Sequence, residues 1–382
     1  MNIAVMRETG AGEARVALVP ESVQKLVALK ATVAVESSAG IGAARSDDDY
    51  RHAGAQVYDD RNSLLESADV LVAVNRPSPD DFGRLKKGAA VVGFLRPLDE
   101  PSALQPALER GLTTFAVELI PRITRAQAMD ALSSMATVAG YKAVLLGAER
   151  IPRMFPLLMT AAGTVPPARV LVLGAGVAGL QAIATAKRLG AVVEGFDVRA
   201  VAGEQVRSLG AKFLEVDLAG VQTEDKGGYA VELTEEVMDR GRALIAEHAK
   251  SADVIVTAAQ VPGKRAPLLV TEEAVEGMRH GSVIVDLAAS TGGNCALSKA
   301  DEIVERNGVT VLAPSNLPAT VPVHASQLYS RNVTAFLSLL IKDGELHIDL
   351  SDDVVGPSCV THEGRIVNDR VAAALEKVFS HG

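Results

Sequence analysis

A segment in the middle of the chain constrains its fold more than any other. Residues 169–200, RVLVLGAGVAGLQAIATAKRLGAVVEGFDVRA, pass from an apolar strand through a glycine-rich turn into a helix and on to a second strand. Parallel strands that are joined by a helix belong to doubly wound α/β sheets, whose strands are buried on both faces and have nearly continuous apolar sequences. The segment therefore predicts a Rossmann-like domain.

The turn in this segment has the spacing G-x-G-x-x-G, formed by Gly174, Gly176 and Gly179. The first glycine permits the tight turn, the second lets the backbone approach a pyrophosphate, and the third lets helix and strand pack closely. Because a helix N-terminus attracts phosphates, we assign Val177 and Ala178 to the same cofactor-binding site. The alternative interpretation is a βα turn with a structural role only.

An acidic residue ends the second strand of the segment. Asp197 stands 18 residues after Gly179, where a carboxylate accepts hydrogen bonds from a ribose and repels a 2′-phosphate, so the pattern favours NAD over NADP. Val198 and Arg199 follow directly and are assigned to the cofactor site. We expect the Arg199 side chain to face solvent or the pyrophosphate and to weaken the preference for NAD slightly.

Apolar strands recur on both sides of this segment. The runs that predict strands are NIAVM, ATVAVES, ADVLVAV, AAVVGFL and LTTFAVEL before it, and DVIVTAA, SVIVDLAA and GVTVLAP after it. Two long helical patterns, one starting near Arg122 and one in HASQLYSRNVTAFLSLLI, connect the series. We predict an α/β fold of two doubly wound Rossmann-like domains with a cleft between them, joined by two long helices. The first domain comprises residues 1–135 plus 325–382, and residues 136–324 form the NAD(H)-binding domain.

Composition excludes several classes of protein. The net charge of −9 argues against a nucleic-acid or anionic-membrane surface, which needs clustered Lys and Arg. Two cysteines, Cys295 and Cys359, are too few for a disulfide framework or a zinc site, so we expect a reduced compartment and no metal. We also expect neither a signal peptide nor a membrane span.

A polar sequence precedes the first long helix. PRITRAQAMD, residues 121–130, places Arg122, Gln127 and Asp130 in front of the apolar run ALSSMATVAGYKAVLLGA. Ser and Asp at such positions satisfy free N–H groups of a helix start, so an ordinary solvated cap is one interpretation. A binding role for these side chains is the other, and the rest of the chain decides between them.

The chain resembles a known family over essentially all 382 residues. RETGAGEARVALVPESV, AAGTVPPARVLVLGAGVAGLQAIATAKRLGA and VDLA…GGN are similar to alanine dehydrogenase and to the NAD(H)-binding component of proton-translocating nicotinamide nucleotide transhydrogenase. The dehydrogenase pattern has an Arg, a Lys, a His and an Asp for its amino-acid chemistry. Here Arg15 matches the Arg, but Asn75 stands at the Lys, Arg96 lies near the position of the His, and Ser290 stands at the Asp.

The transhydrogenase branch gives the polar sequence a role. The resemblance implies that Arg122, Gln127, Asp130 and Ser133 hold the dihydronicotinamide and its carboxamide, with Arg122 and Asp130 hydrogen-bonded to each other. Direct hydride transfer between two nicotinamides moves no proton at the reacting carbon. Catalysis is then mostly positioning, and a site without an acid or base is expected.

Three further cofactor-binding residues are assigned after later strands. The resemblance implies that TEDKGGYAVELTEEV is a mobile loop in which Tyr229 covers the adenosine side, although a plain surface loop is an alternative. Gln260 in AAQVPGK and Asn316 in PSNLPATVP follow strands at the edge where a Rossmann cleft opens. We expect Gln260 to contact the nucleotide and Asn316 to lie near the nicotinamide.

The resemblance implies the NAD(H)-binding subunit of a proton-translocating transhydrogenase, an enzyme that needs partner chains. NADP(H) is expected on a partner NADP(H)-binding domain, and an integral membrane subunit is expected to move the protons. A homodimer in the cytoplasm, peripheral at the inner membrane through these partners, follows from the same resemblance. An alanine dehydrogenase-like enzyme and a non-catalytic NAD-sensing module are the alternatives.

Overall fold

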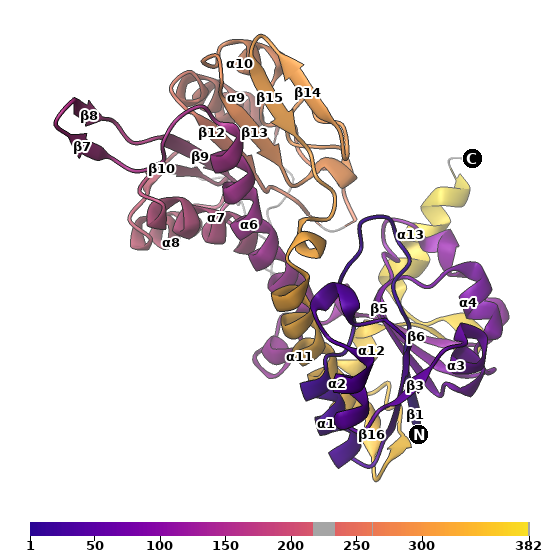
Figure 1. The fold of residues 1–382 in the computed structure, drawn as a ribbon. Coiled ribbons are helices and arrows are strands. Elements are labelled where there is room, and N and C mark those ends of the chain that lie inside the picture. Colours follow the sequence, from indigo (N-terminus) through magenta and orange to yellow (C-terminus); the bar gives the residue numbers. More distant parts are fainter. Residues whose placement is uncertain (217–233, 262, 381–382) are drawn as a thin grey trace. The chain divides into compact units, whose positions relative to one another are not determined.

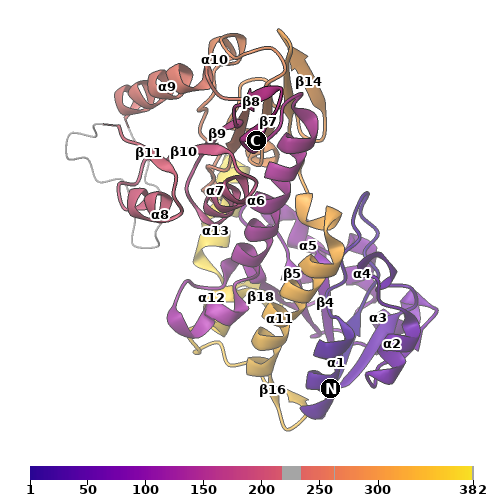
Figure 2. The same ribbon diagram turned by 60° about the vertical axis from the view of Figure 1, so that its left-hand side comes forward.

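The computed structural model describes residues 1–216, 234–261 and 263–380, and the chain folds into two compact units (Figures 1 and 2). The first unit is formed by Met1–Met135 together with Pro318–Gly382, and the second by Ala136–Leu317. The chain therefore leaves the first unit once and returns to it.

The first unit is built on a largely parallel sheet. Its strand order is β3 (Gln56–Tyr58), β2 (Thr32–Glu36), β1 (Asn2–Val5), β4 (Val70–Asn75), β5 (Ala90–Phe94), β6 (Thr113–Ala116), β18 (Cys359–His362) and β19 (Arg365–Ile366). From β3 to β6 the strands are parallel, in the order 3-2-1-4-5-6 of a doubly wound fold. The last two strands are antiparallel additions that the chain supplies after its return.

The second unit repeats this topology. Its strand order is β11 (Lys212–Leu214), β10 (Val192–Phe196), β9 (Arg169–Leu173), β12 (Val254–Thr257), β13 (Val283–Asp286), β15 (Val309–Leu312) and β14 (Ile303–Arg306). All neighbours are parallel except β14 and β15. The expectation of two doubly wound Rossmann-like sheets is confirmed.

Helices and short turns connect the strands of each unit. The first unit contains α1 (Pro20–Ala28), η1 (Ile41–Ala43), α2 (Asp47–His52), α3 (Arg61–Ser67), α4 (Pro79–Arg84), η2 (Pro101–Leu104), α5 (Gln105–Glu109), η3 (Val117–Leu119), η4 (Thr124–Met129), α11 (Pro322–Leu340), α12 (Val355–Ser358) and α13 (Asp369–Ser380). The second unit contains α7 (Val177–Arg188), α8 (Ala202–Ser208), α9 (Glu235–Ala249), α10 (Glu272–Glu276) and η5 (Ala289–Thr291). Helix α6 (Ala131–Arg150) and turn η6 (Leu317–Thr320) include the points where the two units divide.

Local sequence explains where several helices begin. In α2 the Ser46 hydroxyl accepts from the Asp49 N–H at 3.2 Å, and the Asp49 carboxylate accepts from the Ser46 N–H at 2.7 Å. Ser78 and Asp81 form the same reciprocal pair at the start of α4. Each such cap satisfies two otherwise unpaired N–H groups and contributes about 1 kcal/mol.

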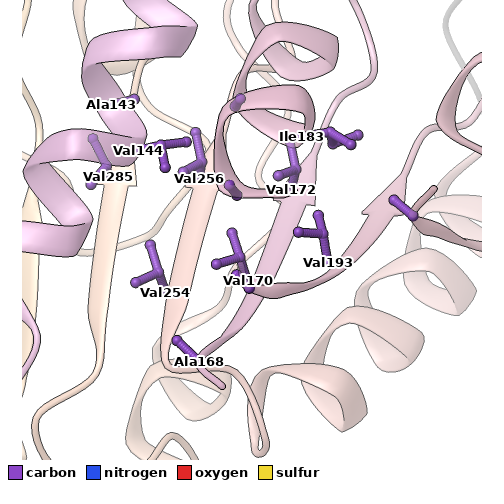
Figure 3. Close-up of a cluster of buried hydrophobic side chains, with 14 of the residues drawn as sticks. Ala143, Val144, Ala168, Val170, Val172, Ile183, Val193, Val254, Val256 and Val285 are labelled. Atoms are coloured by element: carbon purple, nitrogen blue, oxygen red, sulfur yellow. The ribbon is translucent and has the colours of Figure 1, made fainter. Parts of the chain in front are cut away.

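The strands of the second sheet are buried on both faces, as their continuous apolar sequences predict. Val170 and Val172 of β9 join one hydrophobic core, where Val144 of α6 packs against them (Figure 3). The alternate residues Leu171 and Leu173 join a second core on the opposite face. Side chains that alternate between two cores fix the register of the strand, because a slip of one residue would exchange the faces.

Among the described residues, α6 is the helix long and apolar enough to cross a membrane by length and composition. Its Ala143 and Val144 are fully buried in the core of the second unit. Packing inside the unit therefore accounts for these two apolar side chains. The helix begins at Ala131, later than the position near Arg122 expected from the sequence, because η4 precedes it.

Candidate functional site

The first candidate site lies at the carboxyl edge of the second unit's sheet, where β9 ends. Gly174 has a φ of +94°, in the left-handed region that favours glycine. A Cβ atom there would lie 2.8 Å from the Ala259 nitrogen and 2.9 Å from the Ala258 carbonyl carbon, both just after β12. The sheet order reverses between β9 and β12, which is where doubly wound sheets bind their ligands.

The other two glycines of the turn have different surroundings. Gly176 precedes α7, and a Cβ atom there would meet no described atom within 4 Å. At Gly179 a Cβ atom would lie only 1.7 Å from the Gly174 carbonyl oxygen. The second position therefore leaves space in front of the turn, whereas the third lets α7 pack directly on it, as the spacing of the motif predicts.

The first turn of α7 is suited to an anion. In the described part of the chain no side chain caps this turn, and it contains no acidic residue. The first N–H groups of a helix lack intrahelical partners and carry a partial positive charge. Val177 and Ala178 begin the helix and contribute such groups, so the turn fits a pyrophosphate.

Asp197 lies beside this turn and organises it. Its carboxylate accepts from the Ala175 N–H at 2.7 Å and from the Arg199 N–H at 2.8 Å. The Arg199 guanidinium folds back and donates from Nε and Nη2 to the two carboxylate oxygens, each at 2.9 Å. The Arg199 side chain is 18% exposed and pairs with Asp197, so it does not simply face solvent, and its contact with a pyrophosphate stays a prediction. A ribose hydroxyl that reaches Asp197 has to share the carboxylate with this guanidinium.

Two buried residues that the sequence analysis did not single out hold the neighbouring loops. The Asn294 side chain accepts from the Ala259 N–H at 3.0 Å and donates to the Ala259 and Pro267 carbonyls at 2.9 and 2.8 Å. Asp286 accepts from the Asn294 N–H at 2.8 Å, from Thr257 Oγ1 and from Ser298 Oγ. Both residues lie in the VDLA…GGN motif, which was the available signal.

The three residues assigned after later strands differ in what the structure says of them. Gln260 is exposed and donates from Nε2 to the Leu287 carbonyl at 2.9 Å, which places it at the carboxyl edge of β12 and β13. Asn316 is half-buried after β15. Tyr229 lies outside the described residues. Val198 is half-buried and packs against the second core of its unit.

The second candidate site lies in the first unit, in and after η4. Arg122 and Gln127 are exposed, whereas Ala126 and Met129 of the same turn are buried. Two apolar side chains therefore hold this turn in the core, while Arg122 and Gln127 lie at the surface. The expected hydrogen bond between Arg122 and Asp130 stays a prediction.

Asp130 caps helix α6. Its Oδ1 accepts from the Ser133 N–H at 2.8 Å and its Oδ2 accepts from the Ser133 hydroxyl at 2.6 Å. The interpretation of PRITRAQAMD as a helix cap is therefore correct for Asp130. A cap of this kind holds the carboxylate and the hydroxyl in fixed positions.

The corresponding edge of the first unit's sheet contains a buried polar network. Here the order reverses between β1 and β4, and Glu8 follows β1. The Glu8 carboxylate accepts from the Val74 N–H at 2.6 Å and from Asn75 Nδ2 at 3.1 Å. Asn75 Nδ2 also donates to Glu13 at 2.9 Å. Burial raises the pKa of Glu8 above its ordinary value, and the negative charge of Glu13 adds to the rise.

The guanidinium of Arg15 is hydrogen-bonded within this network. Arg15 donates from Nε and Nη2 to the two oxygens of Glu13, at 2.8 and 2.6 Å, and from Nη1 to the Met135 sulfur at 3.4 Å. Although burial alone raises it, the hydrogen bonds and charge of Arg15 hold the pKa of Glu13 at about 2. Arg15 is thus held in a buried ion pair and is not presented to the carboxylate of an amino-acid substrate.

Different residues stand where the dehydrogenase pattern has its His and its Asp. Arg96 has a φ of +53° and pairs with Asp99 and Glu100 at the surface. Ser290 lies exposed in η5. Neither position holds the His or the Asp of the dehydrogenase pattern. In the described ranges 1–216, 234–261 and 263–380, no three His, Cys, Asp or Glu residues are grouped so that they could hold a metal ion.

Glu118 in η3 fixes the backbone at Arg96. Its Oε1 accepts from the Leu95 N–H at 2.9 Å and from the Arg96 N–H at 2.5 Å. Its Oε2 is buried and has no hydrogen-bond partner among the described residues. Burial raises the pKa of Glu118 to about 7, and the nearby Asp99 adds to the rise.

This carboxyl group makes stability depend on pH. In the unfolded chain Glu118 ionises near 4.5, so between pH 4.5 and 7 the folded state holds a proton that the unfolded state has lost. The free energy of unfolding therefore falls as pH rises through that window, by about 3 kcal/mol from this group. We expect Glu118→Gln to remove this contribution and leave a smaller fall from groups such as Glu8, whose pKa is also raised. Urea denaturation at pH 5 and pH 8 measures the difference between the two proteins. Equal losses in both proteins between these pH values would contradict the assignment.

The geometry of the second unit fits a dinucleotide. A left-handed glycine, an open turn, an uncapped helix start and an acidic residue after the next strand meet at the switch point of its sheet. The chain is therefore a dinucleotide-binding α/β protein with a second doubly wound unit.

Comparison with known proteins narrows this class. The family models for the alanine dehydrogenase/PNT N-terminal and C-terminal domains match residues 4–139 and 143–369. The chain belongs to the alanine dehydrogenase/PNT family. It is 46% identical over 376 residues to the first part of the NAD(P) transhydrogenase alpha subunit of Rhodospirillum rubrum, covering 96% of this chain and 98% of that one.

Among solved structures, a transhydrogenase is more similar to this chain than an alanine dehydrogenase is. The transhydrogenase structure from Sinorhizobium meliloti matches with a TM-score of 0.88 and 42% identity, over 96% of this chain and 100% of that chain. An L-alanine dehydrogenase structure matches with a TM-score of 0.83 and 28% identity, over 99% and 100%. The two branches share the fold, and the chain lies with the transhydrogenase alpha subunits.

Proposed function

We propose that this chain is the NAD(H)-binding subunit of a proton-translocating transhydrogenase. The observation that carries the proposal is the closed ion pair of Arg15 with Glu13, completed by Asn75. An amino-acid dehydrogenase needs a cation for the substrate carboxylate and a proton carrier at the reacting carbon. In this chain Arg15, which matches the arginine of the dehydrogenase pattern, is paired with Glu13 in a buried network.

The residues of the second unit bind NAD(H). Gly174, Gly176 and the first turn of α7 receive the pyrophosphate, and Asp197 receives the adenosine ribose by sharing its carboxylate with Arg199. A 2′-phosphate would meet the Asp197 carboxylate, so NAD(H) is preferred over NADP(H). Tyr229, Gln260 and Asn316 complete the site.

The residues around η4 hold the reacting end. When NADH is bound, it supplies a hydride for NADP⁺ on the partner domain. Gln127 and Arg122 are exposed to receive the carboxamide and the ring, and Asp130 and Ser133 are held in position by their mutual hydrogen bonds. These side chains orient the nicotinamide ring and exclude water from it. They need not act as acid or base, because hydride transfer requires no proton at the reacting carbon.

The partners follow from the same proposal. An NADP(H)-binding domain and an integral membrane subunit complete the enzyme, and inward proton movement drives hydride transfer from NADH to NADP⁺. The chain is placed in the cytoplasm, peripheral at the inner membrane through these subunits. The R. rubrum relative is named as one part of an alpha subunit, which supports the need for other chains.

The first experiment measures NADPH-dependent reduction of an NAD analogue by this protein mixed with a transhydrogenase NADP(H)-binding domain. The expected result is rapid transfer that requires both proteins. Absence of transfer while NADH still binds would favour a sensing module. Oxidation of NADH with pyruvate and ammonium, in the absence of the partner domain, would restore the dehydrogenase interpretation.

A homodimer is included in the proposal, and a hairpin of the second unit supports it. Strands β7 (Leu158–Thr160) and β8 (Gly163–Val165) form an arm that extends from their unit (Figure 1). Met159 is 76% exposed on this arm, and Leu157 beside it is 53% exposed. Apolar side chains gathered on an extended arm are typical of a surface that another chain covers.

We expect Met159→Asp to weaken the dimer about tenfold or more, because a carboxylate would be buried there without a partner. Sedimentation velocity over a concentration series measures the effect. Ile303→Asp is the matched control, since Ile303 is 58% exposed on the edge strand β14 and should leave association unchanged. An unchanged dimer in the Met159 variant would remove the arm from the interface.

A further inference from the structure

The turn that carries Gln127 is weakly held by its own hydrogen bonds. η4 is a 3₁₀-helix of six residues, Thr124–Met129, and such runs are uncommon beyond three or four residues because their hydrogen-bond geometry is poor. Only Ala126 and Met129 of its side chains are buried. The position of Gln127 therefore depends on what ties the turn to the rest of the first unit.

Two polar ties reach η4 from distant parts of the chain. Asn332 of α11 donates from Nδ2 to the Ala128 carbonyl at 2.9 Å. On the other side of Gln127, the Arg125 guanidinium donates from Nη2 to Asp352 and from Nη1 to Asp353, which lie just before α12. The first tie fixes backbone after Gln127, and the second fixes backbone before it.

The carboxylate that receives Arg125 is itself fixed. Asp352 Oδ1 accepts from the Val354 and Val355 N–H groups at 2.8 and 3.1 Å, where α12 begins. Its Oδ2 is left facing Arg125. The guanidinium therefore contacts a preorganised acceptor, and a fork of two donors on two carboxylates restricts it more than a single contact would.

These ion pairs contribute little to folding. The Arg125 side chain is 45% exposed, and exposed pairs of this kind are weak because water and salt screen them. The same pairs restrict where η4 lies, and hydride transfer is sensitive to displacements of about 1 Å. A substitution that changes the free energy of unfolding little but slows hydride transfer strongly indicates a residue that positions the reacting groups.

We propose that Arg125 is a positioning residue for hydride transfer, which clamps η4 to Asp352 and Asp353 so that Gln127 meets the nicotinamide. The inference rests on the proposed role of Gln127. Arg125 touches neither nucleotide and acts through the backbone of η4. The clamp joins residues more than 200 positions apart in the sequence, so that the returning segment of the chain sets the geometry of the reacting end.

The test is a single-turnover measurement of hydride transfer with saturating NADP(H)-binding domain. We expect Arg125→Ala to slow the transfer about tenfold, with the Kd for NADH changed less than twofold and Tm unchanged. Arg125→Lys should recover some of the rate, since lysine keeps the charge but reaches only one carboxylate well. Asp353→Asn should fall between wild type and Arg125→Ala.

The matched control is Arg240→Ala, which removes an exposed arginine paired with Glu236 on α9 and should leave the rate unchanged. A wild-type rate in Arg125→Ala, alongside slow transfer in Gln127→Ala, would overturn the clamp and leave the proposed site intact. Wild-type transfer in Gln127→Ala would instead overturn the proposed site. A parallel loss of Tm and NADH affinity in Arg125→Ala, with no recovery by lysine, would show a structural role and also overturn the clamp.

Discussion

Replacement of Gln127 by alanine is expected to slow hydride transfer by a factor of about 100 or more while NADH still binds nearly as well as to the wild type. The proposed pyrophosphate and ribose contacts belong to the second unit, so we expect a change in η4 to leave them intact. Loss of the proposed carboxamide contact would let the nicotinamide ring rotate, so that productive alignment would become rare. Single-turnover kinetics and an NADH fluorescence titration separate the two effects.

Thr124→Ala is the control for this prediction, because Thr124 is an exposed residue at the start of the same turn. Its rate should stay within about twofold of wild type, as expected for a surface substitution. If Gln127→Ala abolished NADH binding and left the rate of the bound complex normal, Gln127 would be a binding residue and the positional role would be wrong.

Replacement of Gly140 by alanine is expected to lower stability strongly. Gly140 lies in α6, and a Cβ atom there would come within 2.0 Å of the Ala178 carbonyl oxygen in the first turn of α7. Since backbone cannot move aside as a flexible side chain does, the two helices have to separate. We expect a loss of about 3 kcal/mol in the free energy of unfolding and at least a roughly tenfold weaker affinity for NADH.

Gly83→Ala is the matched control in urea denaturation. Gly83 lies in α4, where a Cβ atom would meet no described atom within 4 Å, and alanine favours a helix by about 1 kcal/mol over glycine. This variant should be as stable as wild type or slightly more so. An unchanged denaturation midpoint in Gly140→Ala would contradict the close approach of α6 and α7.

The sequence predicted the parallel strands well because burial on both faces leaves a direct mark on composition. Runs such as VLVAV and VIVTAA contain almost no polar side chains, and in the structure they form β4 and β12. Strands that are partly exposed left no such mark. β14 is largely exposed and antiparallel. β18 is buried, but it pairs with β6 from a position about 240 residues later in the chain, so no neighbouring pattern predicted it.

The candidate sites were predictable where a local motif carries the chemistry and unpredictable where partners come from far away. The glycine spacing and the capping role of Asp130 are local features of the sequence. The guanidinium of Arg199 turning back onto Asp197 depends on side-chain direction, which the sequence pattern does not specify. Asp352 and Asp353, which bind Arg125, lie in a segment that had no motif to draw attention to it.

The network of Glu8, Glu13, Arg15 and Asn75 has a consequence for how the two branches of the family diverge. A lysine at position 75 would give two carboxylates two cations, whereas asparagine leaves one negative charge in excess. Burial, together with the charge of Glu13, raises the pKa of Glu8, so the excess charge falls on a carboxyl group whose ionised form is disfavoured. Where the dehydrogenase pattern has a lysine, this chain keeps the two carboxylates together through an amide that donates to both, with Arg15 as the cation of Glu13.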